Sequence, residues 1–235
     1  MRTGEDPALE AVAACALDLI EDGATVGLGS GYAAAAFVTR LAVRVQEGLR
    51  VAGVATSEAI AREARALGIL LVALDDMDLD LTIDGADEVA PNLDLIKGWG
   101  GALVRERIVA SASRRQVLLV GNDKLVRALG EHGRIPIEVI PLARGPVTVR
   151  LRSPGIDATV RPLPGGAGPL VTENGNLILD CAPRDQVEDG AAARALEATL
   201  LAIPGVVDTG LFLGTADRVI VGYANGRVDV LGGAG

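Results

Sequence analysis

Apolar residues recur along the first half of the chain in two alternating patterns. One repeats every three to four residues, which predicts helices with one buried face. The other is a short apolar run bounded by glycine or acidic residues, which predicts a buried strand. The predicted helices are residues 10–20, 33–45, 57–67 and 102–113, and the predicted strands are residues 24–28, 50–55, 69–73, 79–83 and 116–120.

Strands that alternate with helices predict a parallel sheet with helices on both faces. Ligands of such sheets bind at the carboxyl ends of the strands. The polar residues that directly follow the predicted strands are therefore the first candidates for a functional site.

The pattern changes near residue 135. Short strands are predicted at 147–149 and 158–161, an irregular Pro- and Gly-rich loop at 162–169, a hairpin turn at Asn174-Gly175, a helix at 190–201, and strands at 219–223 and 228–231. We interpret the fold as α/β. A Rossmann-like catalytic domain with a parallel sheet is expected from residues 1–128 and 204–235, with a smaller α+β domain, residues 129–203, inserted into it.

Composition excludes several classes of protein. The chain has 235 residues, a net charge of −9 and 2% aromatic residues, so it lacks the basic surface and stacking rings that bind nucleic acid. No apolar stretch reaches the roughly 18 residues of a membrane span. Cys15 and Cys181 stand outside any CxxC pair, which indicates a reduced, cytoplasmic protein. A single histidine, His132, argues against a His-rich metal site.

The first candidate site is Gly27-Leu28-Gly29-Ser30-Gly31, between a predicted strand and a predicted helix. Backbone N–H groups in such a loop can bind a phosphate, helped by the helix N-terminus. The nicotinamide pattern G-x-G-x-x-G fails because Tyr32 occupies its third glycine position, and no Gly-Lys-Ser/Thr completes a P-loop. A tight turn that binds nothing explains the loop equally well.

The second candidate is Asp84-Gly85-Ala86-Asp87-Glu88, which follows the predicted strand 79–83. Its carboxylates can converge on a small polar ligand or on a divalent metal ion. An acidic N-terminus of a helix would give the same pattern, and taken alone the motif favours that simpler interpretation.

The third candidate is Lys97-Gly98-Trp99-Gly100-Gly101, which precedes the helix that carries Glu106. A lysine, a glycine loop and a helix N-terminus can stabilise an oxyanion, and a desolvated Glu106 can act as a general base. Its neighbours Arg105 and Arg107 leave a solvated charged face as the alternative. Lys124, after the strand 116–120, would add a cation. We expect all these loops to follow strands of one parallel sheet and to meet at its edge.

Taken together, the motifs resemble ribose-5-phosphate isomerase type A. The resemblance rests on Asp84-Gly85-Ala86-Asp87-Glu88-Val89, Leu95-Ile96-Lys97-Gly98, Gly100-Gly101-Ala102-Leu103 and Arg105-Glu106-Arg107-Ile108-Val109-Ala110 in this order and spacing. Further along, it is supported by Pro136-Ile137-Glu138-Val139-Ile140-Pro141, Thr172-Glu173-Asn174-Gly175-Asn176, Gly205-Val206-Val207 and Gly210-Leu211-Phe212.

The resemblance implies interconversion of ribose 5-phosphate and ribulose 5-phosphate through an enediol(ate), without cofactor or metal. It implies Glu106 as the base, Lys97 as oxyanion stabiliser, and Asp84 and Asp87 as residues that bind hydroxyls and assist ring opening. It also implies a cytoplasmic homodimer or homotetramer. The substrate-binding residues expected from it are Gly29, Ser30, Gly31, Tyr32, Ala33, Gly85, Ala86, Gly98, Trp99, Gly100 and Lys124.

The chain departs from the family pattern at both loops. Where the family has Gly-Thr-Gly-Ser-Thr, this chain has Ser30, Tyr32 and Ala33, and Trp99 interrupts the glycine loop after Lys97. Losing two hydrogen bonds to a phosphate, each worth about 1.5–3 kcal/mol, lowers affinity roughly a hundredfold or more. We therefore hypothesise intact proton-transfer machinery with an altered phosphate end. The alternatives are an isomerase for another, non-phosphorylated sugar and a weakly active sugar-phosphate-binding paralogue.

Overall fold

The computed structural model describes residues 6–75, 78–184 and 187–233, which form two compact units. Unit 1 contains residues up to 86 together with 105–124 and 215–235, and unit 2 contains residues 87–104 and 125–214. Unit 2 thus takes in residues 87–104, 125–128 and 204–214 in addition to the segment 129–203 expected from the sequence. The expected division into a Rossmann-like catalytic domain and a smaller inserted α+β domain stays a prediction.

Unit 1 is built on a seven-stranded sheet in the order β14-β13-β7-β4-β1-β2-β3. Adjacent strands are parallel except for β14, which runs antiparallel to β13 at one edge. This confirms the expected Rossmann-like α/β fold. The strands are β1 (Ala24–Leu28), β2 (Val51–Ala55), β3 (Leu70–Leu71), β4 (Leu81–Gly85), β7 (Gln116–Gly121), β13 (Arg218–Gly222) and β14 (Val228–Gly232).

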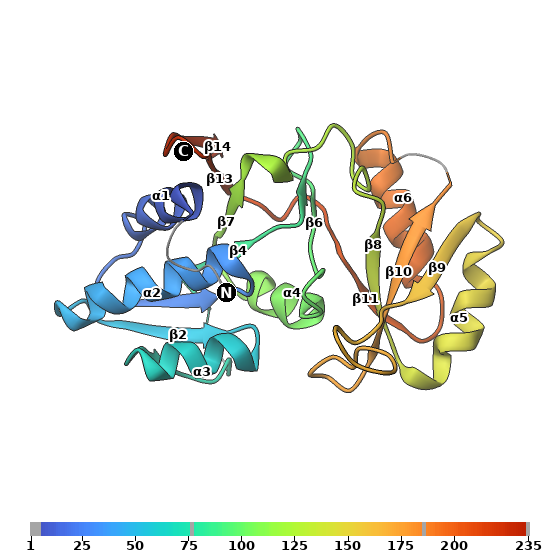
Figure 1. Cartoon of the computed structure of the whole chain (residues 1–235), viewed down its shortest axis with the longest axis horizontal. Helices are drawn as coiled ribbons and strands as arrows, with labels where there is room; N and C mark the ends of the chain where they lie inside the picture. The colour runs from blue at the N-terminus through green and yellow to red at the C-terminus, as the bar shows by residue number, and fades with distance from the viewer. Residues whose placement is uncertain (1–5, 76–77, 185–186, 234–235) are drawn as a thin grey trace. The chain divides into compact units, whose positions relative to one another are not determined.

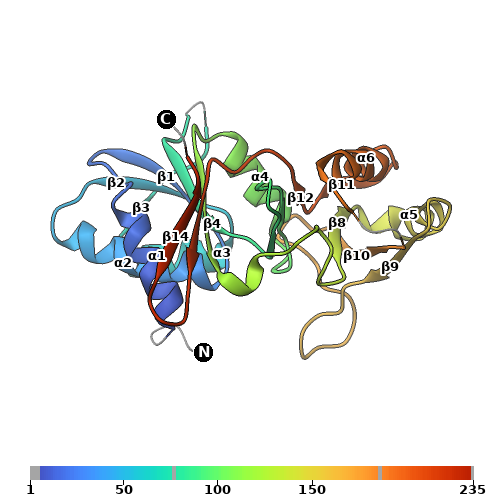
Figure 2. The same cartoon turned by 90° about the horizontal axis from the view of Figure 1, so that it is seen from above.

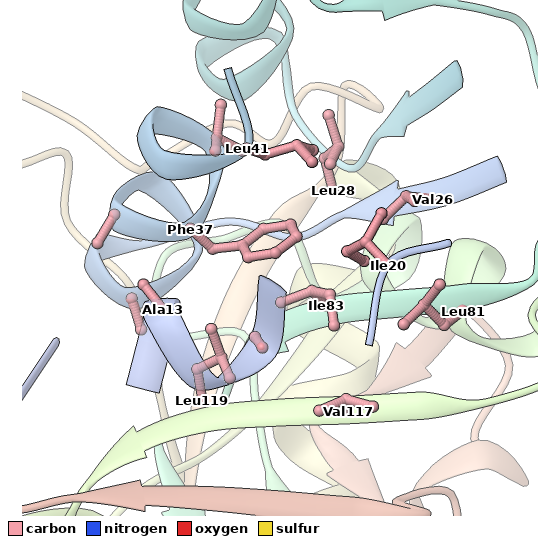
Figure 3. Close-up of a cluster of buried hydrophobic side chains, with 14 of the residues drawn as sticks. Ala13, Ile20, Val26, Leu28, Phe37, Leu41, Leu81, Ile83, Val117 and Leu119 are labelled. Carbon is pink, nitrogen blue, oxygen red and sulfur yellow. The ribbon is translucent and has the colours of Figure 1, made fainter. Parts of the chain in front are cut away.

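Helices cover both faces of this sheet, as the alternating pattern predicted (Figure 1). On one face, α1 and α2 enclose a cluster of apolar side chains that includes Phe37, Leu28 and Ile83 (Figure 3). On the other face lies α4, where a Cβ atom on Gly27 would come within 2.6 Å of Val109. The helices are α1 (Pro7–Leu17), α2 (Tyr32–Gln46), α3 (Glu58–Ala66) and α4 (Leu103–Ser111).

Unit 2 contains a four-stranded antiparallel sheet in the order β11-β8-β10-β9. Alternate residues of its strands, among them Ile137 and Leu179, face a core that α5 and α6 close from one side (Figure 2). The intervening residues Glu138 and Asp180 therefore lie on the opposite face of the sheet. The elements are β8 (Ile135–Val139), β9 (Ile156–Val160), β10 (Leu177–Pro183), β11 (Val206–Thr209), α5 (Arg144–Leu151) and α6 (Gly190–Leu201).

A second, three-stranded sheet in unit 2 has the order β12-β6-β5 and is also antiparallel. Its strands are only two residues long: β5 (Glu88–Val89), β6 (Leu95–Ile96) and β12 (Leu211–Phe212). The prediction that the Lys97 loop follows a strand of the parallel sheet is therefore wrong, because Lys97 follows β6. Backbone pairing in this small sheet, which includes the Lys97 N–H to the Gly210 carbonyl at 2.9 Å, sets where that loop begins.

The strand predicted at residues 147–149 is also wrong, because these residues lie within α5. Val147 and Leu151 are four residues apart, and both are fully buried in the core of unit 2. A helix places residues at that spacing on one face, so burial of this pair outweighs the strand preference of the β-branched residues between them.

Candidate active site

Three hydroxyl groups meet at the carboxyl edge of the parallel sheet in unit 1. Ser30 follows β1, and its Oγ lies 2.8 Å from Oγ1 of Thr56 and 3.0 Å from Oγ of Ser57, both of which follow β2. Thr56 is fully buried, and Ser57 caps α3 by accepting the N–H of Ile60. We call Ser30, Thr56 and Ser57 the hydroxyl cluster.

The hydroxyl cluster stands where two helices begin, α2 at Tyr32 and α3 at Glu58. Helix N-termini carry partial positive charge and N–H groups without intrahelical partners, so this edge suits an anion. Tyr32 is 73% exposed and Ala33 is buried. Sequence reasoning missed Thr56 and Ser57, because a serine before a predicted helix indicates an N-cap and does not by itself indicate a ligand.

Asp84 lies at the end of β4 and is fully buried. Its Oδ1 accepts the backbone N–H of Ser30 at 3.0 Å and that of Gly85 at 2.7 Å. The carboxylate thus ties the turn after β1 to the end of β4, and it brings Ser30, Gly85 and Asp84 together as predicted from strand order. No helix follows this motif, because β5 begins at Glu88, so interpreting it as the acidic start of a helix is wrong.

Glu106 lies in the first turn of α4 and is only 5% exposed. The other end of this helix lies beside the beginning of β4, since the Ala112 carbonyl accepts the N–H of Leu79 at 2.8 Å. The first turn therefore points toward the carboxyl edge of the sheet. Arg105 is partly exposed and pairs with Glu58 at 3.8 Å, so it does lie on a solvated face. Glu106 is buried, so the solvated-face interpretation does not hold for Glu106.

Lys124 follows β7 in a short 3-10 turn, residues Asn122–Lys124. Its side chain is 33% exposed, and Nζ lies 3.7 Å from Oδ2 of Asp123. Because β7 neighbours β4 in a parallel sheet, Lys124 belongs to the same carboxyl edge as Asp84.

Lys97 opens the glycine-rich loop of unit 2 and is 2% exposed. Its ammonium group lies 5.5 Å from the centroid of the Phe212 ring, a distance at which a cation and an aromatic face attract each other. Gly98 has φ +98°, and a Cβ atom there would lie 2.7 Å from Cβ of Leu103. Glycine is therefore required at this position for two independent reasons.

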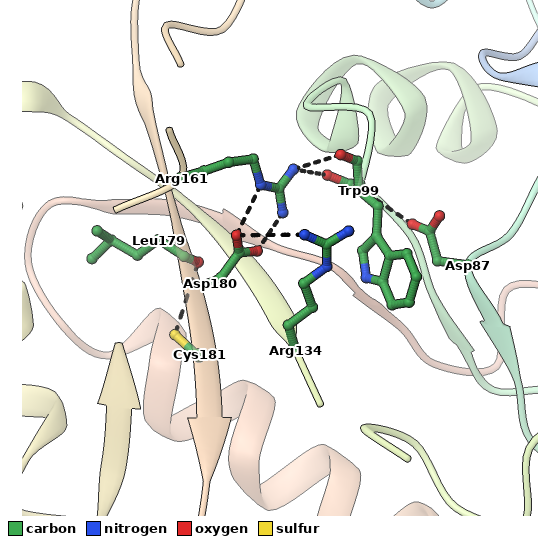
Figure 4. Close-up of polar contacts among 8 residues, drawn as sticks. Asp87, Trp99, Arg134, Arg161, Leu179, Asp180 and Cys181 are labelled. Atoms are coloured by element: carbon green, nitrogen blue, oxygen red, sulfur yellow. Dashed lines mark hydrogen bonds and ion pairs between the residues drawn. The ribbon is translucent and has the colours of Figure 1, made fainter. Parts of the chain in front are cut away.

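Asp87 holds this loop from one side. Its Oδ2 accepts the backbone N–H of Trp99 at 2.8 Å, and its own N–H donates to the Ile96 carbonyl at 2.8 Å (Figure 4). The Trp99 ring contacts two basic side chains, since the Arg134 guanidinium lies 4.4 Å from the ring centroid and the His132 ring centroid lies 6.1 Å away. Trp99 is thus part of an ordered cluster.

Glu88, the last acidic residue of the motif Asp84-Gly85-Ala86-Asp87-Glu88, holds a turn of the backbone in place. It is fully buried, and its two carboxylate oxygens accept the N–H groups of Gly130 at 2.6 Å and of His132 at 2.9 Å. His132 is accordingly a turn residue, as expected.

The buried cysteine, Cys181, does not form a reactive site. Burial, and to a lesser extent the nearby Asp180 carboxylate, raises the pKa of the Cys181 thiol to about 12, so it is protonated at neutral pH. Within residues 6–75, 78–184 and 187–233, no three His, Cys, Asp or Glu side chains are grouped so that they could hold a metal ion. In the same residues, no helix is long and apolar enough to cross a membrane.

Comparison with known proteins identifies the family. The model of the family "Ribose 5-phosphate isomerase A (phosphoriboisomerase A)" matches residues 52–226. Ribose-5-phosphate isomerase A of Gloeobacter violaceus is 48% identical over 220 residues, which are 92% of each chain. The solved structure of ribose 5-phosphate isomerase A from Methanocaldococcus jannaschii is 40% identical, with a TM-score of 0.89 over 97% of this chain and 99% of that one.

A further solved structure, of a D-ribose-5-phosphate isomerase in complex with phospho-erythronic acid, is 36% identical with a TM-score of 0.89, and covers 96% of this chain and 97% of its own. The fold and these matches define an α/β enzyme of the isomerase class. The chain belongs to the ribose 5-phosphate isomerase A family.

Proposed function

We propose that the protein interconverts ribose 5-phosphate and ribulose 5-phosphate. The observation that carries the proposal is the 48% identity, over 92% of both chains, to a ribose-5-phosphate isomerase A. The alternatives, another substrate or a weakly active binding paralogue, are not favoured, because relatives of the same name match at 43–48% identity over most of the chain.

Glu106 is the base in this proposal. Its carboxylate removes the proton from C2 of the open-chain aldose, and the C2–H electron pair forms the C1–C2 double bond as the C1 carbonyl becomes an oxyanion. Return of a proton to C1, with transfer of the O2 proton to O1, yields the ketose. The near-complete burial of Glu106 supports the role, because a carboxylate withdrawn from water is a stronger base toward carbon.

Lys97 and the amides of the loop after it stabilise the enediolate oxygen. A fixed cation and fixed N–H donors in a site with little water lower the energy of developing negative charge without reorganising. Asp84 and Asp87 bind sugar hydroxyls and assist ring opening, and the proposal assigns Gly85, Ala86, Gly98, Trp99 and Gly100 to substrate binding. The mechanism draws on carboxylate, ammonium and amide groups, so the proposal includes no cofactor and no metal.

The phosphate is assigned to the edge of unit 1. Gly29, Ser30 and Gly31 lead into α2, which begins with Tyr32 and Ala33. The hydroxyl cluster adds the Thr56 and Ser57 hydroxyls to these residues predicted from the sequence. Lys124 supplies a cation at this edge. The solved relative that holds phospho-erythronic acid, a phosphorylated sugar acid, supports a ligand of this chemical class. The proposal extends to a cytoplasmic location and to a homodimer or homotetramer. Light scattering of the purified protein measures its molar mass and therefore tests the number of subunits.

The test is a coupled assay of the purified protein with ribose 5-phosphate, beside Glu106→Gln and Glu47→Gln. Glu106→Gln removes the base and nearly keeps the shape, so turnover should fall at least a hundredfold. Glu47 is an exposed glutamate at the end of α2, and its variant should keep wild-type rates. An inactive but folded wild type, or full activity in Glu106→Gln, contradicts the proposal.

A further inference from the structure

Arg161 is a buried arginine that the proposed mechanism does not use. It directly follows β9 in unit 2 and is 6% exposed. Its Nε, at 3.0 Å, and its Nη2 both donate to the carboxylate of Asp180, while Nη1 donates to the backbone carbonyls of Gly98 at 2.7 Å and Trp99 at 2.8 Å (Figure 4). One guanidinium thus joins a strand of the four-stranded sheet to two successive peptide groups of the Lys97 loop.

Peptide geometry determines what these contacts do to the loop. In a trans peptide the C=O and N–H point in opposite directions, and the described chain has no cis peptide. The peptide whose carbonyl is that of Gly98 carries the Trp99 N–H, which donates to Asp87 at 2.8 Å. A cation therefore binds one end of this peptide group and an anion binds the other.

The next peptide group, which joins Trp99 to Gly100, is oriented by Arg161 at its carbonyl end. Its carbonyl, that of Trp99, accepts from Arg161, so its N–H, that of Gly100, points away from the guanidinium. A cation at a carbonyl oxygen draws electron density from the amide and strengthens the N–H as a donor. Arg161 therefore fixes the direction of two loop N–H groups and makes both better donors.

The residue type fits this task. The loop contains Gly98, Gly100 and Gly101, so its own backbone restricts its conformation weakly, and the restriction has to come from outside. A planar guanidinium can grip a carboxylate with two nitrogens and still reach two carbonyls with a third. An ammonium group, with three donors at one point, cannot span these acceptors.

We propose that Arg161, held by Asp180, is a positioning residue that orients and polarises the peptide groups after Lys97: it directs the Trp99 N–H to the Asp87 carboxylate and orients the Gly100 N–H to bind the developing oxyanion. This rests on the proposed isomerase function. Arg134 also approaches Asp180, at 4.0 Å, but its guanidinium lies against the Trp99 ring and it is 42% exposed. Arg161, by contrast, donates hydrogen bonds to both loop carbonyls.

The experiment compares Arg161→Gln, Arg161→Lys and Asp180→Asn with wild type in steady-state turnover of ribose 5-phosphate. Removing a direct oxyanion donor costs about a hundredfold to a thousandfold in kcat, so a residue acting through such donors should cost roughly tenfold to a hundredfold. KM should stay within about threefold of wild type, because KM reports binding that substrate and transition state share. Arg161→Lys should not restore kcat.

Inhibition by two anions separates positioning from general damage. Phospho-erythronic acid carries a carboxylate as well as a phosphate, so its inhibition constant should rise in the variants, whereas that of inorganic phosphate should not change. Val160→Ala is the matched control, since Val160 precedes Arg161 on β9 and packs against the core of unit 2. It should lower the unfolding temperature and leave kcat and both inhibition constants unchanged.

Each outcome decides the proposal. Unchanged kcat in folded Arg161→Gln overturns it, as does an equal weakening of both inhibitors. If the Arg161 variants do not fold, Asp180→Asn decides in the same way, with an expected fall in kcat of about threefold to tenfold, less than for removing the donors themselves. An inactive wild type would instead refute the proposed function, so the two failures are distinguishable.

Discussion

A Cβ atom on Gly29 would lie 2.1 Å from Oδ1 of Asp84 and 2.5 Å from its Cα. Asp84 can therefore occupy its place at the end of β4, and bind the Ser30 N–H, only because residue 29 lacks a side chain. The closeness of these two residues couples the turn after β1 to the carboxylate.

Gly29→Ala should consequently destabilise the fold and displace Asp84. Overpacking of this kind costs about 1–3 kcal/mol, which urea unfolding can measure, and kcat/KM for ribose 5-phosphate should fall with it. Gly145→Ala is the control, because nothing lies within 4 Å of that position in α5. It should raise the free energy of unfolding by about 0.5–1 kcal/mol. Wild-type stability and kcat/KM in Gly29→Ala would show that the site tolerates a side chain.

Ser30→Ala should weaken phosphate binding and leave proton transfer intact. The variant removes a hydroxyl from the hydroxyl cluster, and a hydrogen bond to a charged group is worth about 1.5–3 kcal/mol, so KM should rise about tenfold or more. The rate at saturation should change little. Thr39→Val removes an exposed hydroxyl from α2, which donates to the Ala35 carbonyl, and should have no effect on KM. An unchanged KM in Ser30→Ala would show that the phosphate does not bind at the hydroxyl cluster.

Asp80 should make stability depend on pH in the acid range. Its pKa is lowered, first by the backbone N–H and hydroxyl of Thr25 and then by nearby Arg114 and Arg115. A lowered folded pKa stabilises the fold above the unfolded value of about 3.9, and this stabilisation is lost as pH falls through the folded pKa. At pH 7, the urea concentration at the unfolding midpoint should therefore be lower for Asp80→Asn than for wild type. The difference between the two midpoints should become smaller toward pH 3. A difference between the midpoints that does not change with pH would contradict this prediction.

Cys181 should resist thiol reagents in the native protein. The thiolate is the reactive form, and a pKa of about 12 leaves almost none of it at pH 8. In a Cys15→Ala variant, a disulfide-exchange reagent should label nothing under native conditions and one thiol in urea. The raised pKa also means that stability falls with pH between the unfolded value of about 8.5 and 12, because only the unfolded thiol ionises there. Rapid native labelling would show that the thiol is accessible.

Most of unit 1 could be predicted from the sequence. Its strands are buried apolar runs and its helices have one apolar face, and both patterns reflect burial directly, as at 24–28 and 33–45. Unit 2 was harder to predict because its elements depend on distant partners. The two-residue strands β5, β6 and β12 are too short to show a period, and α5 forms where burial of Val147 and Leu151 outweighs local preference.

Some residues of the candidate site could likewise be predicted from the sequence, and others could not. Residues next to strands of the parallel sheet, such as Ser30 and Asp84, could be found from strand ends alone. Thr56 and Ser57 were missed because single hydroxyl residues carry little chemical signal until a second strand brings them against Ser30. Arg161 could not be found from the sequence at all, since 62 and 63 residues separate it from the carbonyls it binds.

The chain passes between the two units four times, after residues 86, 104, 124 and 214. After residue 214 the chain returns to unit 1 and forms β13, which pairs with β7 in the interior of the sheet. Strand β14 then covers the other edge of β13. During synthesis on the ribosome, β7 therefore keeps an unpaired edge until residues 218–222 have emerged. A nascent chain halted before that point would expose this edge to other chains, so the C-terminal segment completes the sheet and also ends its exposure to aggregation.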